Sequence, residues 1–263
     1  MDLQLTGKVA LVSGSTAGIG YAIARTLAQE GARVIVNGRT ASTTEEAAAR
    51  IHSETGGTVE AYAGDLSRAE AAEALLQRFP AIDILVNNLG IFEPKPFEEI
   101  PDEDWLRFFD VNVLSGVRLS RLVLPAMKRA NWGRIIFISS ESAVQIPTEM
   151  VHYGMTKTAQ LAVSRGLAES VAGTGITVNS VLPGPTKSRG VGDFVEDMAR
   201  ASDKPFEQVE AEFFEHVRPT SLIKRFASPQ EVASLVAYVA SPLASATTGA
   251  ALRVDGGVVK SAF

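Results

Sequence analysis

The stretch Lys8-Val-Ala-Leu-Val-Ser-Gly14-Ser-Thr-Ala-Gly18-Ile-Gly20 decides the fold prediction for this chain of 263 residues. Its first half is a short run of apolar, β-branched residues, which predicts a buried strand. An amphipathic pattern typical of a helix follows over residues 19–30. The glycines between the two elements permit positive φ angles and allow a close approach to the backbone of the turn.

A strand-to-helix turn of this kind is suited to bind a pyrophosphate, because the N-terminus of a helix attracts anions. The spacing is G-x-x-x-G-x-G and differs from the commoner G-x-G-x-x-G dinucleotide fingerprint. Glycines in such a turn can also be purely structural. In the binding interpretation, the residues of the turn that contact the cofactor are Gly14, Ser15, Gly18, Ile19 and Gly20.

The rest of the chain repeats the alternation of short apolar runs and longer amphipathic ones. The apolar runs do not alternate with polar residues, as expected for parallel strands that are buried on both faces. We therefore predict a doubly wound parallel sheet of the Rossmann type in a single α/β domain over residues 1–263. The expected strands are 8–13, 33–37, 58–63, 82–86, 134–139, 177–181 and 250–254, and the expected helices are 19–30, 43–54, 68–79, 104–129, 153–172 and 229–240.

One polar stretch, residues 186–218, does not follow this alternation. It is partly helical in pattern and rich in phenylalanine, and we expect it to be a lid or an insertion that contacts the substrate. Phe206, Phe213 and Phe214 recur at helical spacing. Packing onto the sheet is the expected role of these rings, in preference to an aromatic substrate box.

The composition argues against several classes of protein. The net charge is −5, with no block of like charges, so a nucleic-acid partner is not expected. The absence of cysteine removes disulfides, thiolate nucleophiles and metal sites that contain cysteine, and we expect no bound metal. No apolar run is long enough to span a membrane, and no leader pattern is visible at the N-terminus. We expect a soluble, cytoplasmic protein.

The end of the second predicted strand, Asn37-Gly38-Arg39, bears on the choice of cofactor. A carboxylate at this point would bind the ribose hydroxyls of NAD, whereas an arginine suits the 2′-phosphate of NADP. Arg39 offers a planar fork for phosphate and a face that can stack on adenine. The alternative is a solvated surface arginine. We expect a preference for NADP(H), with NAD(H) remaining open.

The chemical signal is Tyr153-Gly-Met-Thr-Lys157 at the start of a predicted helix. Positions i and i+4 share one face of a helix, so the ammonium group and the phenol can lie side by side. A nearby cation, together with a positively charged nicotinamide ring, would lower the pKa of the phenol. Ser139 and Ser140 end the preceding strand, at the carboxyl edge where open α/β sheets bind ligands. A serine there could orient a substrate carbonyl.

Taken together, these motifs resemble those of the short-chain dehydrogenase/reductase family over essentially the whole chain. The glycine turn, the tyrosine–lysine pair and the preceding serine all occur in the family's order and register. The matching positions are Gly14, Gly18, Gly20, Asp65, Asn87-Asn88-Leu89-Gly90, Asn112, Ser140, Tyr153, Lys157, Asn179 and Pro183-Gly184. Ser13, Leu89, Thr156 and Ser188 depart from the usual residues, and only Leu89 adds bulk near the cofactor.

The resemblance implies roles for these residues. Tyr153 and Lys157 would form the acid/base pair, Ser140 would polarise the substrate oxygen, and Asn112 would bind a water that links Lys157 to solvent. Lys157 would also hold the nicotinamide ribose. A homotetramer, or a homodimer, is the expected assembly. The remaining cofactor contacts implied are Asp65, Leu66, Asn88, Gly90, Tyr153, Lys157, Pro183, Gly184, Thr186 and Ser188.

Two residues near the tyrosine invite other interpretations. His152 adjoins Tyr153, but neighbouring helix residues point about 100° apart, so a pocket-lining or surface role is favoured over a catalytic base. Glu141 follows Ser140 and would either bind a polar substrate or lie exposed in a loop.

Two other functions compete with a carbonyl/alcohol oxidoreductase. A protein that only senses NADP(H) would be expected to lack the tyrosine or the lysine, and both are present. A serine hydrolase is disfavoured because G-x-S-x-G is absent. The substrate itself is not indicated by any residue.

Overall fold

The computed structural model describes residues 2–188 and 205–262, and its centre is one sheet of seven parallel strands. The order β3-β2-β1-β4-β5-β6-β7 confirms the doubly wound fold. The strand order reverses between β1 and β4, where ligands bind in open sheets of this kind. The strands are β1 (Val9–Val12), β2 (Arg33–Gly38), β3 (Val59–Ala63), β4 (Ile84–Asn87), β5 (Gly133–Ile138), β6 (Ile176–Pro183) and β7 (Ala251–Val254).

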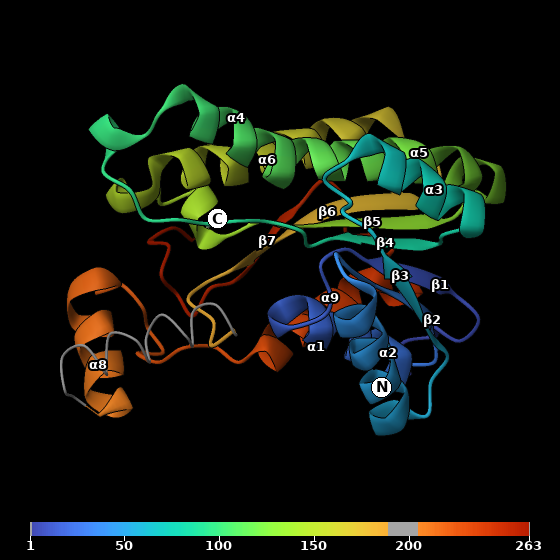
Figure 1. Cartoon of the computed structure of the whole chain (residues 1–263), viewed down its shortest axis with the longest axis horizontal. Helices are drawn as coiled ribbons and strands as arrows, with labels where there is room; N and C mark the ends of the chain where they lie inside the picture. Colours follow the sequence, from blue (N-terminus) through green and yellow to red (C-terminus); the bar gives the residue numbers. More distant parts are fainter. Residues whose placement is uncertain (1, 189–204, 263) are drawn as a thin grey trace.

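Helices cover both faces of the sheet (Figure 1). One face carries α1 (Gly18–Gln29), α2 (Ala41–Thr55) and α9 (Pro229–Ala240). The other carries α3 (Ala69–Arg78), α4 (Asp102–Phe109), α5 (Ser115–Ala130) and α6 (Val151–Ser170). A separate buried cluster lies on each side of the sheet, which explains why the strand sequences are apolar at nearly every position. α9 begins with the expected Ser228 cap, which forms a capping box with Glu231.

The helix expected over residues 104–129 is divided in the structure. A π-helical turn, Asp110–Leu114, separates α4 from α5. Such turns interrupt the regular hydrogen-bond ladder and often occur at functional sites. The turn brings Asn112 inward, where its exposed fraction is 1%. The apolar period of the sequence continues through the turn, so periodicity alone gave no sign of it.

The phenylalanine stripe does not pack onto the sheet, and that expectation is wrong. Phe213 and Phe214 instead pack against Phe226 in a small cluster of their own, which also includes Val209. This cluster is built around the short helix α8 (Phe206–Glu212), which lies to one side of the main layers (Figure 1). Residues 189–204 of the expected lid lie outside the described residues.

Candidate active site

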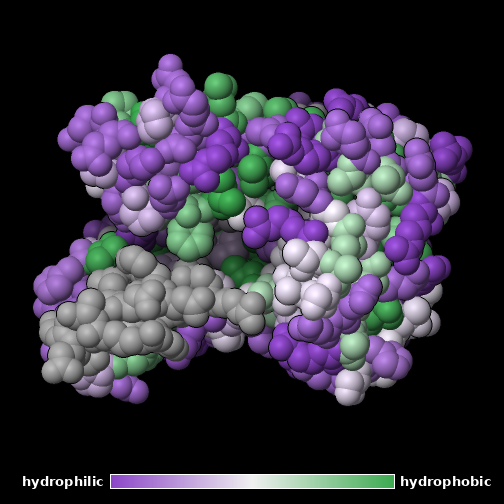
Figure 2. Space-filling model, viewed as in Figure 1, coloured by the Kyte–Doolittle hydropathy of each residue, from purple (hydrophilic) through white to green (hydrophobic). Residues whose placement is uncertain are grey.

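A cavity of about 820 Å³ lies along the carboxyl edge of the sheet. Figure 2 shows a hollow between the upper and lower parts of the molecule, with apolar groups in its floor. The volume lies within the range of small-molecule and cofactor sites. Of the expected site residues, the cavity wall includes Gly18, Ile19, Gly20, Arg39, Asn88, Gly90, Ser140, Tyr153, Lys157, Pro183, Gly184, Thr186 and Ser188. Gly14, Ser15, Asp65, Leu66 and Asn112 are not among the residues that form this wall.

The glycine turn has a backbone shape that favours glycine. Gly14 and Gly18 have φ angles of 62° and 58°. A Cβ atom on Gly20 would lie 2.5 Å from Asn88 Nδ2 and 2.5 Å from the carbonyl oxygen of Gly14. Asn88 Nδ2 donates hydrogen bonds to the carbonyl oxygens of Ser13 and Gly14, so it braces the turn from β4.

Helix α1 begins in a way that fits an anionic ligand. Its N-cap residue, Ala17, makes no side-chain hydrogen bond, and the first turn contains no acidic residue. The first backbone N–H groups of the helix therefore have no capping side chain. The residues at this end of the helix, Gly18, Ile19 and Gly20, line the cavity. A diphosphate is the kind of group that such a terminus binds. This arrangement fits a nicotinamide dinucleotide.

Two polar side chains hold the turn from beneath, and the sequence did not reveal this role. Ser15 Oγ donates to the carbonyl oxygen of Val12 and accepts from the backbone N–H of Asn37. Asn37 Oδ1 accepts from the N–H of Gly14, while Nδ2 donates to the carbonyl oxygens of Tyr62 and Gly64. The hydroxyl of Ser15 is thus used within the turn.

Arg39 is an exposed side chain at the end of β2 and lines the cavity. It makes no ion pair among the described residues. Asp65 and Leu66 follow the neighbouring strand β3, and Leu66 is buried. Burial acts to raise the pKa of Asp65. Hydrogen bonds from the N–H and hydroxyl of Ser67, together with the charges of Arg68 and Arg39, outweigh burial and hold the pKa below its usual value.

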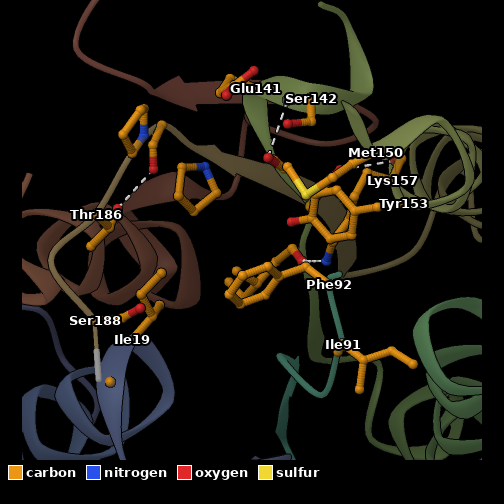
Figure 3. Close-up of a pocket in the computed structure, with 18 of the residues that line it drawn as sticks. Ile19, Ile91, Phe92, Glu141, Ser142, Met150, Tyr153, Lys157, Thr186 and Ser188 are labelled. Atoms are coloured by element: carbon orange, nitrogen blue, oxygen red, sulfur yellow. Dashed lines mark hydrogen bonds between the residues drawn. The ribbon is translucent and has the colours of Figure 1, made fainter. Parts of the chain in front are cut away.

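Tyr153 lies in the first turn of α6, and its hydroxyl points into the cavity (Figure 3). Ser140 lies just beyond the end of β5, where its Oγ accepts from the N–H of Ser142. Burial raises the pKa of Tyr153 to about 12, although a hydrogen bond with Ser140 acts in the opposite direction. Burial is thus the larger of these two effects on the phenol in the protein alone.

The two adjacent serines have different surroundings. Ser139 Oγ donates to the carbonyl oxygen of Lys157, 2.9 Å away, and so ties the strand end to α6. The hydroxyl of Ser140 instead makes a hydrogen bond with Tyr153. Successive side chains of an extended chain point to opposite faces, so the hydroxyl groups of Ser139 and Ser140 reach different partners.

Lys157 lies beneath Tyr153 with an exposed fraction of 4%, and its Nζ is 5.5 Å from the centre of the phenol ring. Nζ donates to the carbonyl oxygen of Ile138 at 2.9 Å and to Gln160 Oε1 at 3.3 Å. Burial lowers the pKa of Lys157 to about 8. Gln160 was not among the expected site residues, although its spacing of three from Lys157 places both on one helix face.

Asn112 acts as a clamp on the loop after β4. Its Oδ1 accepts from the N–H of Ile91, and its Nδ2 donates to the carbonyl oxygen of Ile91 and to Thr156 Oγ1. Its backbone carbonyl oxygen accepts from Gln160 Nε2 at 2.6 Å. The side chain and the carbonyl of Asn112 are therefore both used within the chain.

Glu141 is not an exposed loop residue, and that alternative is wrong. It lines the cavity wall but is only 3% exposed, because Arg218 covers it and pairs with its Oε1 at 3.0 Å. Arg218 also forms an ion pair with Glu149, with 3.2 Å between Nη1 and Oε1. Burial raises the pKa of Glu141, and the charge of Arg218 acts against this effect. Arg218 belongs to the stretch that was expected to contact the substrate.

His152 is neither a pocket-lining nor a surface residue, so its expected role is corrected. It is completely buried and its ring packs between Trp105 and Phe108. Neither ring nitrogen has a hydrogen-bond partner among the described residues. Burial lowers the pKa of His152, which favours the neutral form of this packed ring.

Within residues 2–188 and 205–262, no His, Cys, Asp and Glu side chains gather in a group that could hold a metal ion. In the same residues, no helix has the length and apolar character needed to cross a membrane.

Comparisons with known proteins agree with this geometry. A family model described as enoyl-(acyl carrier protein) reductase matches residues 14–259. The chain is 48% identical over 264 residues to the uncharacterized oxidoreductase YvaG of Bacillus subtilis, and the match covers 100% of both chains.

Two solved structures also resemble the chain closely. One is L-sorbose reductase from Gluconobacter frateurii complexed with NADPH and L-sorbose, with a TM-score of 0.93, 32% identity and coverage of 99% and 100% of the two chains. The other is 7α-hydroxysteroid dehydrogenase complexed with NADH, with a TM-score of 0.86, 31% identity and coverage of 99% and 97%. The chain belongs to the short-chain dehydrogenase/reductase family of oxidoreductases, which act on carbonyl and alcohol groups with a nicotinamide cofactor.

Proposed function

We propose that this protein is an NADP(H)-dependent oxidoreductase that interconverts a carbonyl and a secondary alcohol, with Tyr153 as general acid and base. The observation that carries the proposal is the position of Tyr153. Its hydroxyl faces the cavity next to Ser140, and Lys157 lies buried beneath its ring. A positioned acid, a neutral donor and a fixed cation around one point are what carbonyl reduction requires.

When bound, a nicotinamide cofactor would supply the hydride, and thus the two electrons, that reduction of the carbonyl carbon needs. As the C=O bond becomes a single bond, Tyr153 Oη donates its proton to the oxygen. Ser140 Oγ donates a hydrogen bond to that same oxygen, which strengthens as negative charge develops. Lys157 supplies a fixed positive charge that stabilises the phenolate left on Tyr153. Alcohol oxidation reverses each of these transfers.

The preference for NADP(H) is supported by Arg39, which lines the cavity at the end of β2 without an ion-pair partner among the described residues. A guanidinium group can bind a phosphate with two parallel hydrogen bonds. The structural relatives include one complexed with NADPH and one with NADH.

We also propose that the enzyme is cytoplasmic and assembles into a homotetramer or homodimer. The support is an apolar groove of about 400 Å³ on the outer side of α5 and α6, lined by Val117, Leu124, Val163 and Leu167 among others. Grooves of this kind between helices commonly receive a helix from another subunit.

To test the function, a panel of ketones, aldehydes and secondary alcohols is assayed with each nicotinamide cofactor. Turnover is monitored through the absorbance of the reduced cofactor. We expect turnover with at least one class of carbonyl. Tyr153→Phe should lower kcat by a factor of about 10²–10⁴ while NADPH affinity stays within a few-fold. Tight NADPH binding without turnover of any compound would instead identify a sensor.

A further inference from the structure

The interior beneath the active site contains a direct side-chain bridge that the family resemblance does not imply. The resemblance implies that Asn112 binds a water that links Lys157 to solvent. In the structure, Gln160 joins these two groups itself, with Nε2 on the carbonyl oxygen of Asn112 at 2.6 Å and Oε1 on Lys157 Nζ at 3.3 Å. The exposed fractions of Gln160, Asn112 and Lys157 are 1%, 1% and 4%.

We propose that Gln160 is a positioning residue that fixes Lys157 by this bridge and takes the place of the linking water. The proposal rests on the proposed function of the site. An ammonium group has three N–H donors, and the carbonyl of Ile138 and Gln160 Oε1 hold two of those of Lys157. The remaining donor is available to the cavity, where Lys157 forms part of the wall.

The chemistry of a carboxamide changes what Lys157 can do. A water can donate and accept in either direction, so it passes protons along a chain. The carboxamide of Gln160 has a fixed acceptor toward Lys157 and a fixed donor toward Asn112. Lys157 then acts as a stationary cation that is closed off from the interior, and the Tyr153 phenolate regains its proton from water on the cavity side after each reduction.

The local structure explains why Gln160 reaches both partners. It lies one helical turn after Lys157 on the same face of α6, and that face packs against the π-helical turn that contains Asn112. A π-helical turn loosens the regular backbone ladder of the helix and reorients its carbonyls. Loss of the bridge would leave a buried ammonium and a buried carbonyl each short of one partner.

Two substitutions of Gln160 separate positioning from simple space filling. Gln160→Leu keeps nearly the same volume but removes the bridge, and Gln160→Ala removes the bridge but leaves room for a water. If Gln160 only fills space, alanine should be the more harmful change, because it leaves a cavity. If Gln160 positions Lys157, leucine should be the more harmful, because no water can restore the link.

The first readout is the pH profile of alcohol oxidation, which requires the ionised Tyr153. In Gln160→Leu the pKa of Lys157 falls, less positive charge faces the phenol, and the acid limb of kcat should move up by about one pH unit. The same variant should lose roughly tenfold in kcat/KM, and its KM for the cofactor should rise a few-fold. Gln160→Ala should keep the acid limb within a few tenths of a unit of wild type.

The second readout needs no turnover and therefore separates the failure of this proposal from the failure of the proposed function. The unfolded protein binds a proton on Lys157 up to pH 10.5, whereas the folded protein loses it near pH 8. The free energy of unfolding therefore gains a contribution that rises with pH across that window. In Gln160→Leu the rise of the unfolding free energy with pH should begin at a lower pH than in wild type. In Gln160→Ala it should begin at the wild-type pH. The proposal is overturned if alanine shifts both profiles as much as leucine, or if leucine shifts neither.

Discussion

Ser140 and Ser139 are neighbours in sequence, but their hydroxyl groups serve different partners. Ser140→Ala removes the donor beside Tyr153, so kcat/KM should fall by one to three orders of magnitude. Ser139→Ala removes a buried hydrogen bond to the carbonyl of Lys157. It should lower the free energy of unfolding by about 1 kcal/mol and change kcat/KM much less. Steady-state kinetics and denaturant unfolding of both variants measure these effects. Equal losses of activity would contradict the assignment of Ser140, and not Ser139, to the substrate oxygen.

The cofactor preference can be tested at Arg39 alone. A Cβ atom on Gly38 would lie 2.4 Å from Thr16 Cγ2 and 2.6 Å from Thr44 Oγ1, so an acidic residue cannot be added there without disturbing the turn. We expect wild type to favour NADPH over NADH by about ten- to hundredfold in kcat/KM, as charge-assisted hydrogen bonds to the 2′-phosphate would give. Arg39→Ala should remove most of this preference and leave activity with NADH within a few-fold.

A different outcome at Arg39 has a clear meaning. If the guanidinium only stacks on adenine, which both cofactors share, Arg39→Ala should weaken NADPH and NADH equally. A wild-type protein that uses both cofactors with equal efficiency would also contradict the proposed preference for NADP(H).

Single residues were predicted unevenly from the sequence. Tyr153, Lys157 and Ser140 could be placed together because helix spacing and the carboxyl edge of a parallel sheet fix their positions. The environments of His152 and Glu141 could not, because each depends on distant partners, Phe108 in one case and Arg218 in the other. Burial of a polar residue is a property of the tertiary structure and leaves no periodic signal in the chain.

At the scale of elements, the turn between β1 and α1 gives a sharp test. Gly20→Ala would place a Cβ atom against Asn88 Nδ2 and the carbonyl of Gly14, so the brace from β4 must shift. We expect a loss of roughly 1–3 kcal/mol in the free energy of unfolding and at least about tenfold weaker binding of NADPH. Fluorescence titration and denaturant unfolding measure the two effects.

Gly166 is a matched control for this change. It is an exposed position of α6, and an added Cβ atom there would meet nothing within 4 Å. Gly166→Ala should raise the free energy of unfolding by about 0.4–1 kcal/mol and leave cofactor binding unchanged. If the two substitutions had similar effects, the close approach at Gly20 would not matter.

The elements themselves were well predicted where the sequence pattern is simple. Strands buried on both faces give continuous apolar runs, and α9 carries both its serine cap and a proline at its first turn. The break between α4 and α5 was missed because the apolar face continues through the π-helical turn. The Phe213 and Phe214 rings were assigned to the sheet because helical spacing shows that a face is buried, but not what buries it.

At the scale of the whole molecule, the groove on α5 and α6 should be covered in an assembly. We expect wild type to be a tetramer or a dimer by light scattering, and Val117→Glu to shift it to a smaller species because a charge would enter the apolar groove. Arg129→Glu, at the end of α5 and outside the groove, is the control and should keep the wild-type mass. A wild-type monomer, or a Val117→Glu protein of unchanged mass, would contradict the proposed assembly.

The order of strands in the sheet also affects how the chain folds during its synthesis. β1 pairs with β2 on one side and with β4 on the other, where Ala10 meets Ile84. Parallel neighbours come together only after a long crossover has closed, and the entropy of that closure is lost before the pairing is gained. A nascent chain that ends before Ile84 therefore leaves one edge of β1 open and apolar. Early synthesis is the stage at which this protein should depend most on chaperones to avoid aggregation.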